Sequence, residues 1–211
     1  MLPLLLAMLL AEASPARTPA APPPAAAGAT EADELTRYEL LAPESAQFRI
    51  LYDVTATSAG AVFFFNPIRK GSEASRESVV DRASGEPLKF EIVPGEAARR
   101  SGAADADPGT QYIRVALPRP VPAGGGVRLR IDKTYKDAAS YFQEGDEIVF
   151  RRSLGIPRNV VVLPLGWEVV SCNVPAQVLS EADGRIAVAF MNANASPDPV
   201  SVMIRGRRRE P

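Results

Sequence analysis

Carboxylates that stand close together are the residues of this sequence with the clearest potential for chemistry. Glu144, Asp146 and Glu147 occupy one short polar segment, and glycoside hydrolysis requires two acids that flank a sugar bond. Adjacent residues of a turn rarely converge on one bond, and general acid catalysis also needs a partly buried acid. We therefore expect a surface turn, with Arg151 and Arg152 neutralising the acids across a hairpin.

A second pair of acids suggests a metal ion. Asp105 and Asp107 alternate ahead of Gly109, which is how a calcium-binding loop begins. The third alternate acid and the distant bidentate glutamate of such loops are missing. The segment therefore favours a solvated polar loop, with a weak calcium site as the alternative.

Aromatic and arginine side chains give the best candidate for a binding surface. Exposed rings can stack on sugar rings, and arginine supplies several hydrogen-bond donors. The candidate residues are Tyr135, Tyr141, Arg151, Arg152, Arg158 and Trp167. Single aromatic residues in strands are more often part of the core, so the alternative is that these rings are buried and stabilise the fold without binding a ligand.

The composition excludes whole classes of function. The chain has 211 residues and no histidine, which removes histidine-based zinc sites, nucleophile–histidine pairs and histidine proton shuttles. A single cysteine, Cys172, allows neither an internal disulfide nor a thiolate cluster. The 24 basic and 25 acidic residues nearly balance, which argues against nucleic acid as a partner. We expect no cofactor and no enzymatic activity.

The elements that must position these residues are strands. Apolar residues alternate with polar ones through most of the chain from about residue 35, and such alternation is typical of strands with one buried face. Asp183-Gly184 is a strong hairpin signal, and 118–126 is too rich in proline and glycine for a helix. Residues 137–142 are the only candidate for a short helix. About ten strands predict an antiparallel β-sandwich, immunoglobulin-like or related, with a β-barrel as runner-up.

One stretch is expected to organise the core. Residues 160–163 form an apolar run that predicts a buried strand. Pro164 and Gly166 then make a tight corner, and Trp167, the only tryptophan, follows directly. A tryptophan buries on the order of 200 Å², so we expect Trp167 to pack in the core beside this strand.

Two segments resemble a known family. Val80-Asp81 through Gly85 and Leu88, and then Pro120-Val121 with Gly126 and Leu129, resemble the N-terminal β-sandwich domain of M1-type zinc aminopeptidases over about residues 35–135. In that family the domain packs beside a catalytic domain that carries an H-E-x-x-H helix. Because this sequence has no histidine, the resemblance carries over no zinc ligand and no catalytic acid. It implies a sandwich fold with an accessory or stand-alone role.

The first residues predict export. Residues 1–10 form an apolar run too short to span a bilayer, and Ala11-Glu12-Ala13 matches a signal-peptide cleavage pattern before Ser14. Residues 14–34, rich in alanine and proline, are expected to be a disordered linker. The β-sandwich is then predicted over 35–205 and a basic tail over 206–211. The mature chain would lack a transmembrane helix and would lie in the periplasm of a bacterium or outside the cell.

Together these features favour an exported, non-catalytic β-sandwich that binds a protein or a cell surface. A carbohydrate-binding module and a carbohydrate-processing enzyme that uses only carboxylates are the alternatives.

Overall fold

The computed structural model describes residues 33–192 and 198–210. The predicted leader and nearly all of the predicted linker lie outside these residues, so both stay predictions. Within the described residues no helix is long and apolar enough to cross a membrane.

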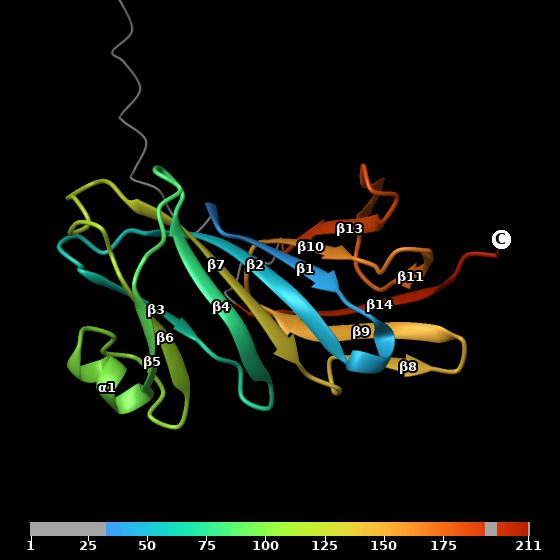
Figure 1. The fold of residues 1–211 in the computed structure, drawn as a ribbon, viewed down its shortest axis with the longest axis horizontal. Helices are drawn as coiled ribbons and strands as arrows, with labels where there is room; N and C mark the ends of the chain where they lie inside the picture. Colours follow the sequence, from blue (N-terminus) through green and yellow to red (C-terminus); the bar gives the residue numbers. More distant parts are fainter. Residues whose placement is uncertain (1–32, 193–197, 211) are drawn as a thin grey trace, which may run out of the picture.

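Seven strands form one long sheet that runs the length of the molecule (Figure 1). Their order is β12-β13-β10-β1-β2-β7-β4. All neighbours pair antiparallel except β1 and β10, which are parallel. In chain order the strands are β1 (Leu35–Leu40), β2 (Gln47–Ala56), β4 (Glu73–Asp81), β7 (Val127–Lys136), β10 (Arg158–Val162), β12 (Gln177–Ser180) and β13 (Ile186–Met191).

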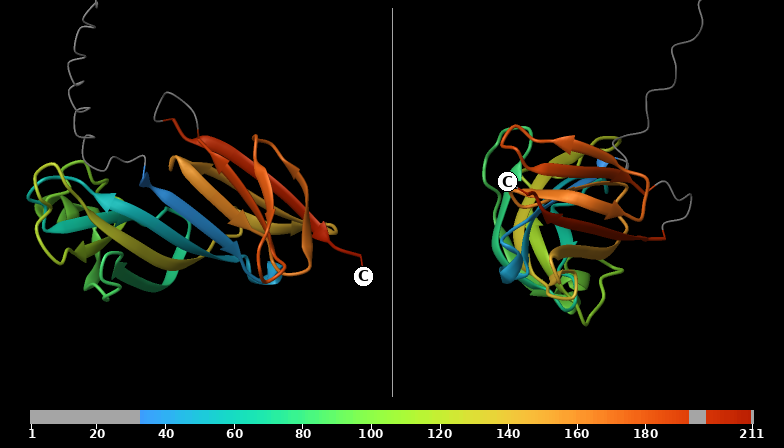
Figure 2. Two further views of the ribbon diagram at one scale, coloured as in Figure 1. Left: turned by 90° about the horizontal axis from the view of Figure 1, so that it is seen from above. Right: turned by 90° about the vertical axis from the view of Figure 1, so that its right-hand side faces the viewer.

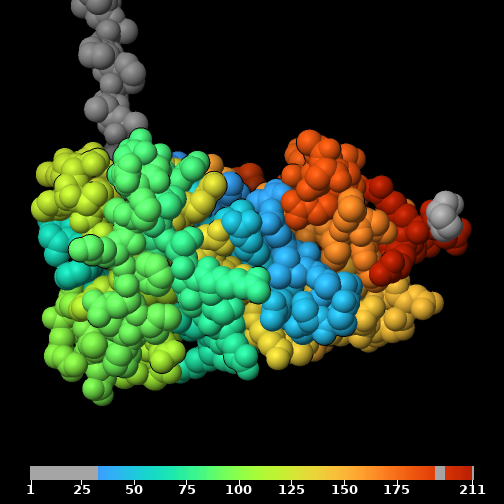
Figure 3. Space-filling model, viewed as in Figure 1, coloured from blue at the N-terminus to red at the C-terminus, as the bar shows by residue number. Residues whose placement is uncertain are grey.

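Two smaller sheets complete the fold (Figure 2). The C-terminal sheet has the order β11-β14-β9-β8, and the small sheet has the order β3-β6-β5. The C-terminal sheet consists of β8 (Tyr141–Glu144), β9 (Glu147–Leu154), β11 (Trp167–Cys172) and β14 (Val200–Arg208). The small sheet consists of β3 (Phe63–Pro67), β5 (Phe90–Pro94) and β6 (Gln111–Ala116). The short helices are η2 (Pro43–Ser45) and α1 (Gly95–Arg100), and α1 lies beside the small sheet at one end of the molecule (Figures 1 and 3).

Both smaller sheets contribute to one continuous core with the long sheet. Buried residues of β6 and β9 belong to the same apolar cluster as the inward residues of β1, β2 and β7. The Phe150 ring of β9, for example, lies 5.5 Å from the ring of Tyr38 in β1 and 5.6 Å from that of Phe48 in β2. The two smaller sheets are separate, with no strand shared between them.

The predicted all-β, antiparallel sandwich is confirmed, and the described strands do not close into a barrel. The predicted number of about ten strands was wrong, because the described residues contain fourteen. β4 was not expected from the sequence, because only Val79 and Asp81 of its nine residues are buried and its pairing with β7 is interrupted after Ser75, which obscures the alternation. The short helix was also misplaced, since residues 137–140 form a turn held by the Asp137 carboxylate.

The corner between β10 and β11 places the only tryptophan in the core. Gly166 has a φ of +82°, which favours glycine, and the Trp167 N–H donates to the Pro164 carbonyl at 3.3 Å. Trp167 is 4% exposed and belongs to the main core cluster together with Val161 and Leu163. The predicted buried position of Trp167 is therefore observed.

Trp167→Ala is expected to lower the free energy of unfolding by about 3–5 kcal/mol, because it removes a large buried side chain and leaves a cavity. Urea denaturation measures this loss. Leu165→Ala is the matched control, since Leu165 stands two residues earlier and is 69% exposed; it should change stability by less than about 0.5 kcal/mol. Equal, small effects of both substitutions would contradict the buried position of the ring.

Candidate functional site

A cavity opens on the inner face of the long sheet between the two smaller sheets. Its volume is about 510 Å³, which is within the usual range for small-molecule sites. The long sheet supplies its floor, β3 and the residues after it supply one wall, and the end of β9 with the residues after it supplies the other. We call it the inter-sheet pocket; its lining includes Thr36, Tyr38, Ile50, Tyr52, Asn66, Arg69, Lys133, Tyr135, Arg152, Leu154 and Ile156.

Lys133 occupies a core-facing position on the floor of this pocket. In β7 the inward residues alternate, so Lys133 falls between Ile131 and Tyr135, which are both buried. Lys133 itself is only 4% exposed. Its Nζ donates a hydrogen bond to Asn66 Oδ1 across the pocket and lies 5.0 Å from the centre of the Tyr135 ring.

The environment of Lys133 disfavours its positive charge. Burial and, to a smaller extent, the charge of Arg152 lower the pKa of Lys133, the charge of Glu77 opposes them, and the resulting pKa is about 7. Lys133 forms no salt bridge with any described residue. The amine is thus desolvated without a direct counter-charge, and about half of it is neutral near pH 7.

Arg152 brings a second buried cation to the pocket. It stands at an inward position of β9, between the buried residues Phe150 and Leu154, and is 7% exposed. Its guanidinium carbon lies 5.1 Å from the centre of the Phe48 ring and 5.6 Å from that of Tyr135. Tyr135 thus contacts both cations. The Arg152 Nε is buried and has no hydrogen-bond partner among the described residues.

One carboxylate, Asp137, partly compensates these charges. Arg152 Nη1 donates to Asp137 Oδ2 at 3.1 Å, and the hydroxyls of Ser140 and Ser72 donate to the same oxygen at 2.7 and 3.0 Å. Burial would raise the pKa of Asp137, but these hydrogen bonds and the charge of Arg152 outweigh it, and the pKa is lowered. Asp137 therefore stays ionised and is already paired with Arg152, which leaves Lys133 without a directly paired carboxylate.

The tyrosines of the pocket do not supply negative charge. Burial raises the pKa of Tyr38 to about 12, although the charge of Arg152 and a hydrogen bond from Thr36 oppose the shift. Burial also raises the pKa of Tyr135, whose hydroxyl oxygen accepts the Arg69 N–H at 3.2 Å. Both phenols remain neutral near pH 7. With Arg69 at its rim, the pocket carries more positive than negative charge.

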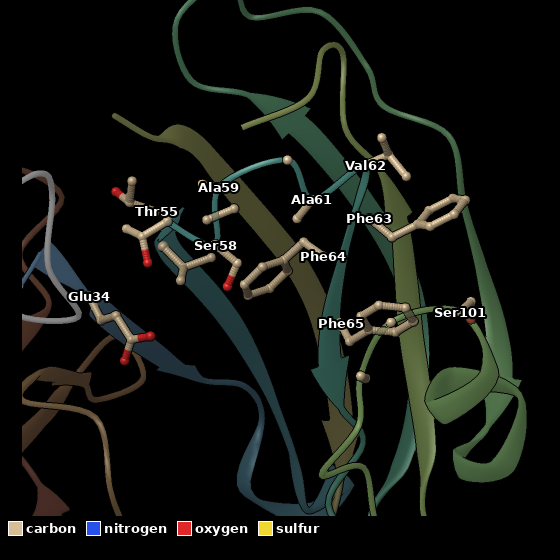
Figure 4. Close-up of a pocket in the computed structure, with 16 residues that line it drawn as sticks. Glu34, Thr55, Ser58, Ala59, Ala61, Val62, Phe63, Phe64, Phe65 and Ser101 are labelled. Carbon is tan, nitrogen blue, oxygen red and sulfur yellow. The ribbon is translucent and has the colours of Figure 1, made fainter. Parts of the chain in front are cut away.

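A larger cavity, of about 660 Å³, lies at the end of β2 and beside β3 (Figure 4). It is lined mainly by small residues and by the rings of Phe63, Phe64 and Phe65, and Glu34 is the only ionisable residue among the described residues that line it. The Glu34 carboxylate accepts a hydrogen bond from the Tyr52 hydroxyl at 2.7 Å. This cavity is large enough for a ligand but presents few charged groups that could bind one, so the inter-sheet pocket is the stronger candidate.

The predicted acidic segment is a structural turn. Glu144 and Glu147 both pair with Arg205 of β14, at 2.6 and 3.0 Å. The expectation that Arg151 and Arg152 would neutralise them was wrong, because β14 and not the β8–β9 hairpin itself provides the cation. The two carboxylates contact one guanidinium, which does not match an acid pair that flanks a sugar bond.

The loop for which a weak calcium site was the alternative is held by hydrogen bonds of its own residues and by Lys70. Asp107 Oδ2 contacts Lys70 Nζ at 2.8 Å and accepts the Thr110 hydroxyl at 3.1 Å, while Oδ1 accepts the Gly109 N–H at 2.8 Å. The hydrogen bond from Lys70, then those from Gly109 and Thr110, lower the pKa of Asp107 to about 2. Asp105 is exposed. No group of three or more Cys, Asp or Glu side chains in the described ranges is placed to hold a metal ion.

The predicted binding surface is divided between the core and the solvent. Tyr135, Tyr141 and Trp167 are buried, so these rings do not form an exposed stacking platform; Trp167 instead packs near the Arg208 guanidinium, at 5.6 Å. Only Tyr135 and Arg152 come together, in the inter-sheet pocket.

The two remaining arginines of that prediction lie apart from this pocket's lining. Arg151 is exposed and lies 5.0 Å from the Phe142 ring. The Arg158 Nε donates to the Glu34 carbonyl at 3.2 Å.

Sequence reasoning missed Lys133, although a signal was present. The alternation of Val127, Leu129 and Ile131 points every second residue of this strand into the core. Continuing the same alternation past Asp132 assigns Lys133 to the buried face. A lysine at that phase is the anomaly that could have identified the pocket.

Comparisons with known proteins show a fold and no family. No family model and no curated protein matches the chain. An M1 zinc metallopeptidase structure from Deinococcus radiodurans is similar with a TM-score of 0.51 and 13% sequence identity, covering 82% of this chain. A mutant from the same organism bound to a Tyr-Ser-Ala substrate gives the same values.

The chain spans 41% of the length of those solved chains. The predicted resemblance to the N-terminal part of M1 peptidases is thus confirmed for the fold, and it extends over more of the chain than residues 35–135.

Replacing Lys133 should change how stability depends on pH. Because its pKa is lowered on folding, the folded state binds fewer protons than the unfolded state between about pH 7 and pH 10, and wild-type stability rises across this window. In Lys133→Met this contribution is absent. The stability advantage of the variant over the wild type should therefore shrink by roughly 2–4 kcal/mol from pH 7 to pH 10, as measured by urea denaturation.

Lys136→Met is the control for this comparison, since Lys136 is an exposed residue of the same strand. The difference in stability between this variant and the wild type should change with pH far less than the difference for Lys133→Met, because the Lys136 side chain is exposed. A pH-independent difference for Lys133→Met as well would show that Lys133 titrates as a solvated lysine.

Proposed function

We propose that this chain is a non-catalytic β-sandwich domain that binds a small carboxylate in the inter-sheet pocket. One observation carries the proposal: Lys133 and Arg152 are both buried at the pocket, and Asp137 is the only carboxylate that pairs directly with either of them in the described residues. An uncompensated buried cation is unfavourable, so an anionic ligand would bind with the desolvation of these groups already achieved by folding.

The shape and chemistry of the pocket favour a carboxylate that carries a short apolar group. Guanidinium and ammonium groups donate charge-assisted hydrogen bonds to carboxylate oxygens. Ile50, Leu154 and Ile156 supply apolar lining that suits a hydrocarbon body. The ligand therefore has an anionic end near Lys133 and Arg152 and an apolar end against these side chains.

The domain is proposed to act as an accessory to a protein or cell-surface partner outside the cytoplasm. The fold likeness to M1 peptidases, in a chain without histidine, supports an accessory role. The apolar run before Ala11-Glu12-Ala13 supports export. The buried rings of Tyr141 and Trp167 give no support to the alternative of a glycan-stacking module.

Propionate tests the binding site directly. In isothermal titration calorimetry of the full chain at constant ionic strength, we expect saturable 1:1 binding that is tighter at pH 6 than at pH 8.5. The reason is that the protonated form of Lys133, which attracts the anion, is lost as the pH rises through about 7. Lys133→Met should weaken binding by about tenfold or more, since it removes a charge-assisted hydrogen bond.

Arg151→Met is the matched control for Arg152→Met, because Arg151 is the exposed neighbour on the same strand. We expect the Arg151 variant to bind propionate as the wild type does and the Arg152 variant to lose binding. Absence of propionate binding to the wild type, or binding of inorganic phosphate alone, would overturn the carboxylate assignment.

A further inference from the structure

We propose that the ligand is a carboxylate that also carries a carbonyl group, such as an α-keto acid, and that Lys133 captures it reversibly as an imine. This inference rests on the proposed carboxylate site and names the ligand class and the covalent step. The reacting atom is Lys133 Nζ, and the anchoring group is the Arg152 guanidinium.

The surroundings of the Lys133 amine favour its action as a nucleophile. An amine reacts only in its neutral form, and lysines become reactive when they are desolvated or lie near another cation. Lys133 meets both conditions, because it is buried on the pocket floor and the charge of Arg152 disfavours its protonation. The charged and titratable groups that face the pocket with it are Arg152 on β9, Arg69 after β3, Tyr38 on β1, Tyr52 on β2 and Tyr135 on its own strand, and the charge of Glu77 on β4 also acts on it.

The hydrogen bond to Asn66 prepares the same atom. Lys133 Nζ is the donor and Asn66 Oδ1 of β3 is the acceptor, so the contact orients the amine and leaves the lone pair of its neutral form available. Asn66 is a neutral partner and does not favour the protonated amine in the way that a carboxylate would. A structural lysine at such a site would be expected to pair with an acid.

Arg152, the second buried cation, can bind the carboxylate of a keto acid whose carbonyl group reacts with Lys133. Arg152 lies near the same Tyr135 ring as Lys133, so a small ligand can place its carboxylate toward the guanidinium and its adjacent carbonyl carbon toward Nζ. The apolar lining at Ile50 and Leu154 is left for the rest of the ligand.

The covalent step is balanced without any other reactant. The Nζ lone pair forms a bond to the carbonyl carbon, the amine gives up two protons, and the carbonyl oxygen leaves with them as water. A C=N double bond joins Lys133 to the ligand, and addition of water reverses the step. The domain thus captures its ligand covalently and releases it unchanged, which requires no turnover.

Reductive trapping tests the inference. The full chain is incubated at pH 7 with pyruvate and sodium cyanoborohydride, and the modified lysines are identified by peptide mass mapping. The sequence contains four lysines, and Lys70, Lys89 and Lys136 are exposed, so they act as internal controls. An ordinary lysine is neutral in about one molecule of 2,500 at pH 7, and we expect Lys133 to be modified at least tenfold faster than each of the other three.

Lactate, which has the carboxylate of pyruvate but no carbonyl, separates this inference from the proposed function. We expect lactate to slow the modification of Lys133 without affecting Lys136, and Lys133→Arg to acquire no adduct at position 133. If propionate or lactate binds and pyruvate labels Lys133 no faster than Lys136, the imine is wrong and the carboxylate site stands. If none of the three acids binds or labels the pocket, both proposals fail.

Discussion

The burial of Lys133 away from water is the constraint on which the inter-sheet pocket and its positive charge depend. The inner face of the long sheet is apolar along nearly its whole length, and a cation placed there loses its hydration without gaining a carboxylate. Such a residue opposes folding unless the surrounding structure leaves space or supplies a partner. Here the two smaller sheets stay separate, the pocket opens between them, and Asn66 provides a neutral acceptor. The pocket thus lies where the core departs from an ordinary apolar sandwich.

The charges around the pocket are divided in a way that preserves its positive potential. Asp137 accepts hydrogen bonds from Ser72 and Ser140 as well as from Arg152. Its carboxylate therefore stabilises the turn that follows β7 and pairs with one cation, Arg152. Acids elsewhere are also paired with arginines: Glu144 and Glu147 both contact Arg205. Within the described residues no carboxylate forms a direct salt bridge with Lys133, and Asp137 pairs with Arg152 instead. The binding proposal follows from this distribution, and the likeness to M1 peptidases contributes only the fold.

Alternation in the sequence was sufficient to predict the sandwich and the buried position of Trp167, because both follow from local patterns of apolar residues. Local patterns could not reveal that β4 belongs to the sheet, since only two of its nine residues are buried and its pairing with β7 is interrupted. They also could not assign Arg205 to the acids of the β8–β9 turn, which lie about sixty residues earlier in the chain. For the site, the alternation of the strand was sufficient to assign Lys133 to the buried face. Its proximity to Asn66 and Arg152, however, depends on how the three sheets pack.

The measurement that tests this account most directly is the pKa of the Lys133 ammonium in the folded chain, determined by nitrogen-detected NMR titration with lysine labelled at Nζ. The account predicts that Lys133 titrates near pH 7 in the free protein and that its pKa rises on saturation with propionate, because the bound anion favours the charged amine. A Lys133 resonance that titrates near the ordinary lysine value of about 10.4, and that does not respond to propionate, would contradict it.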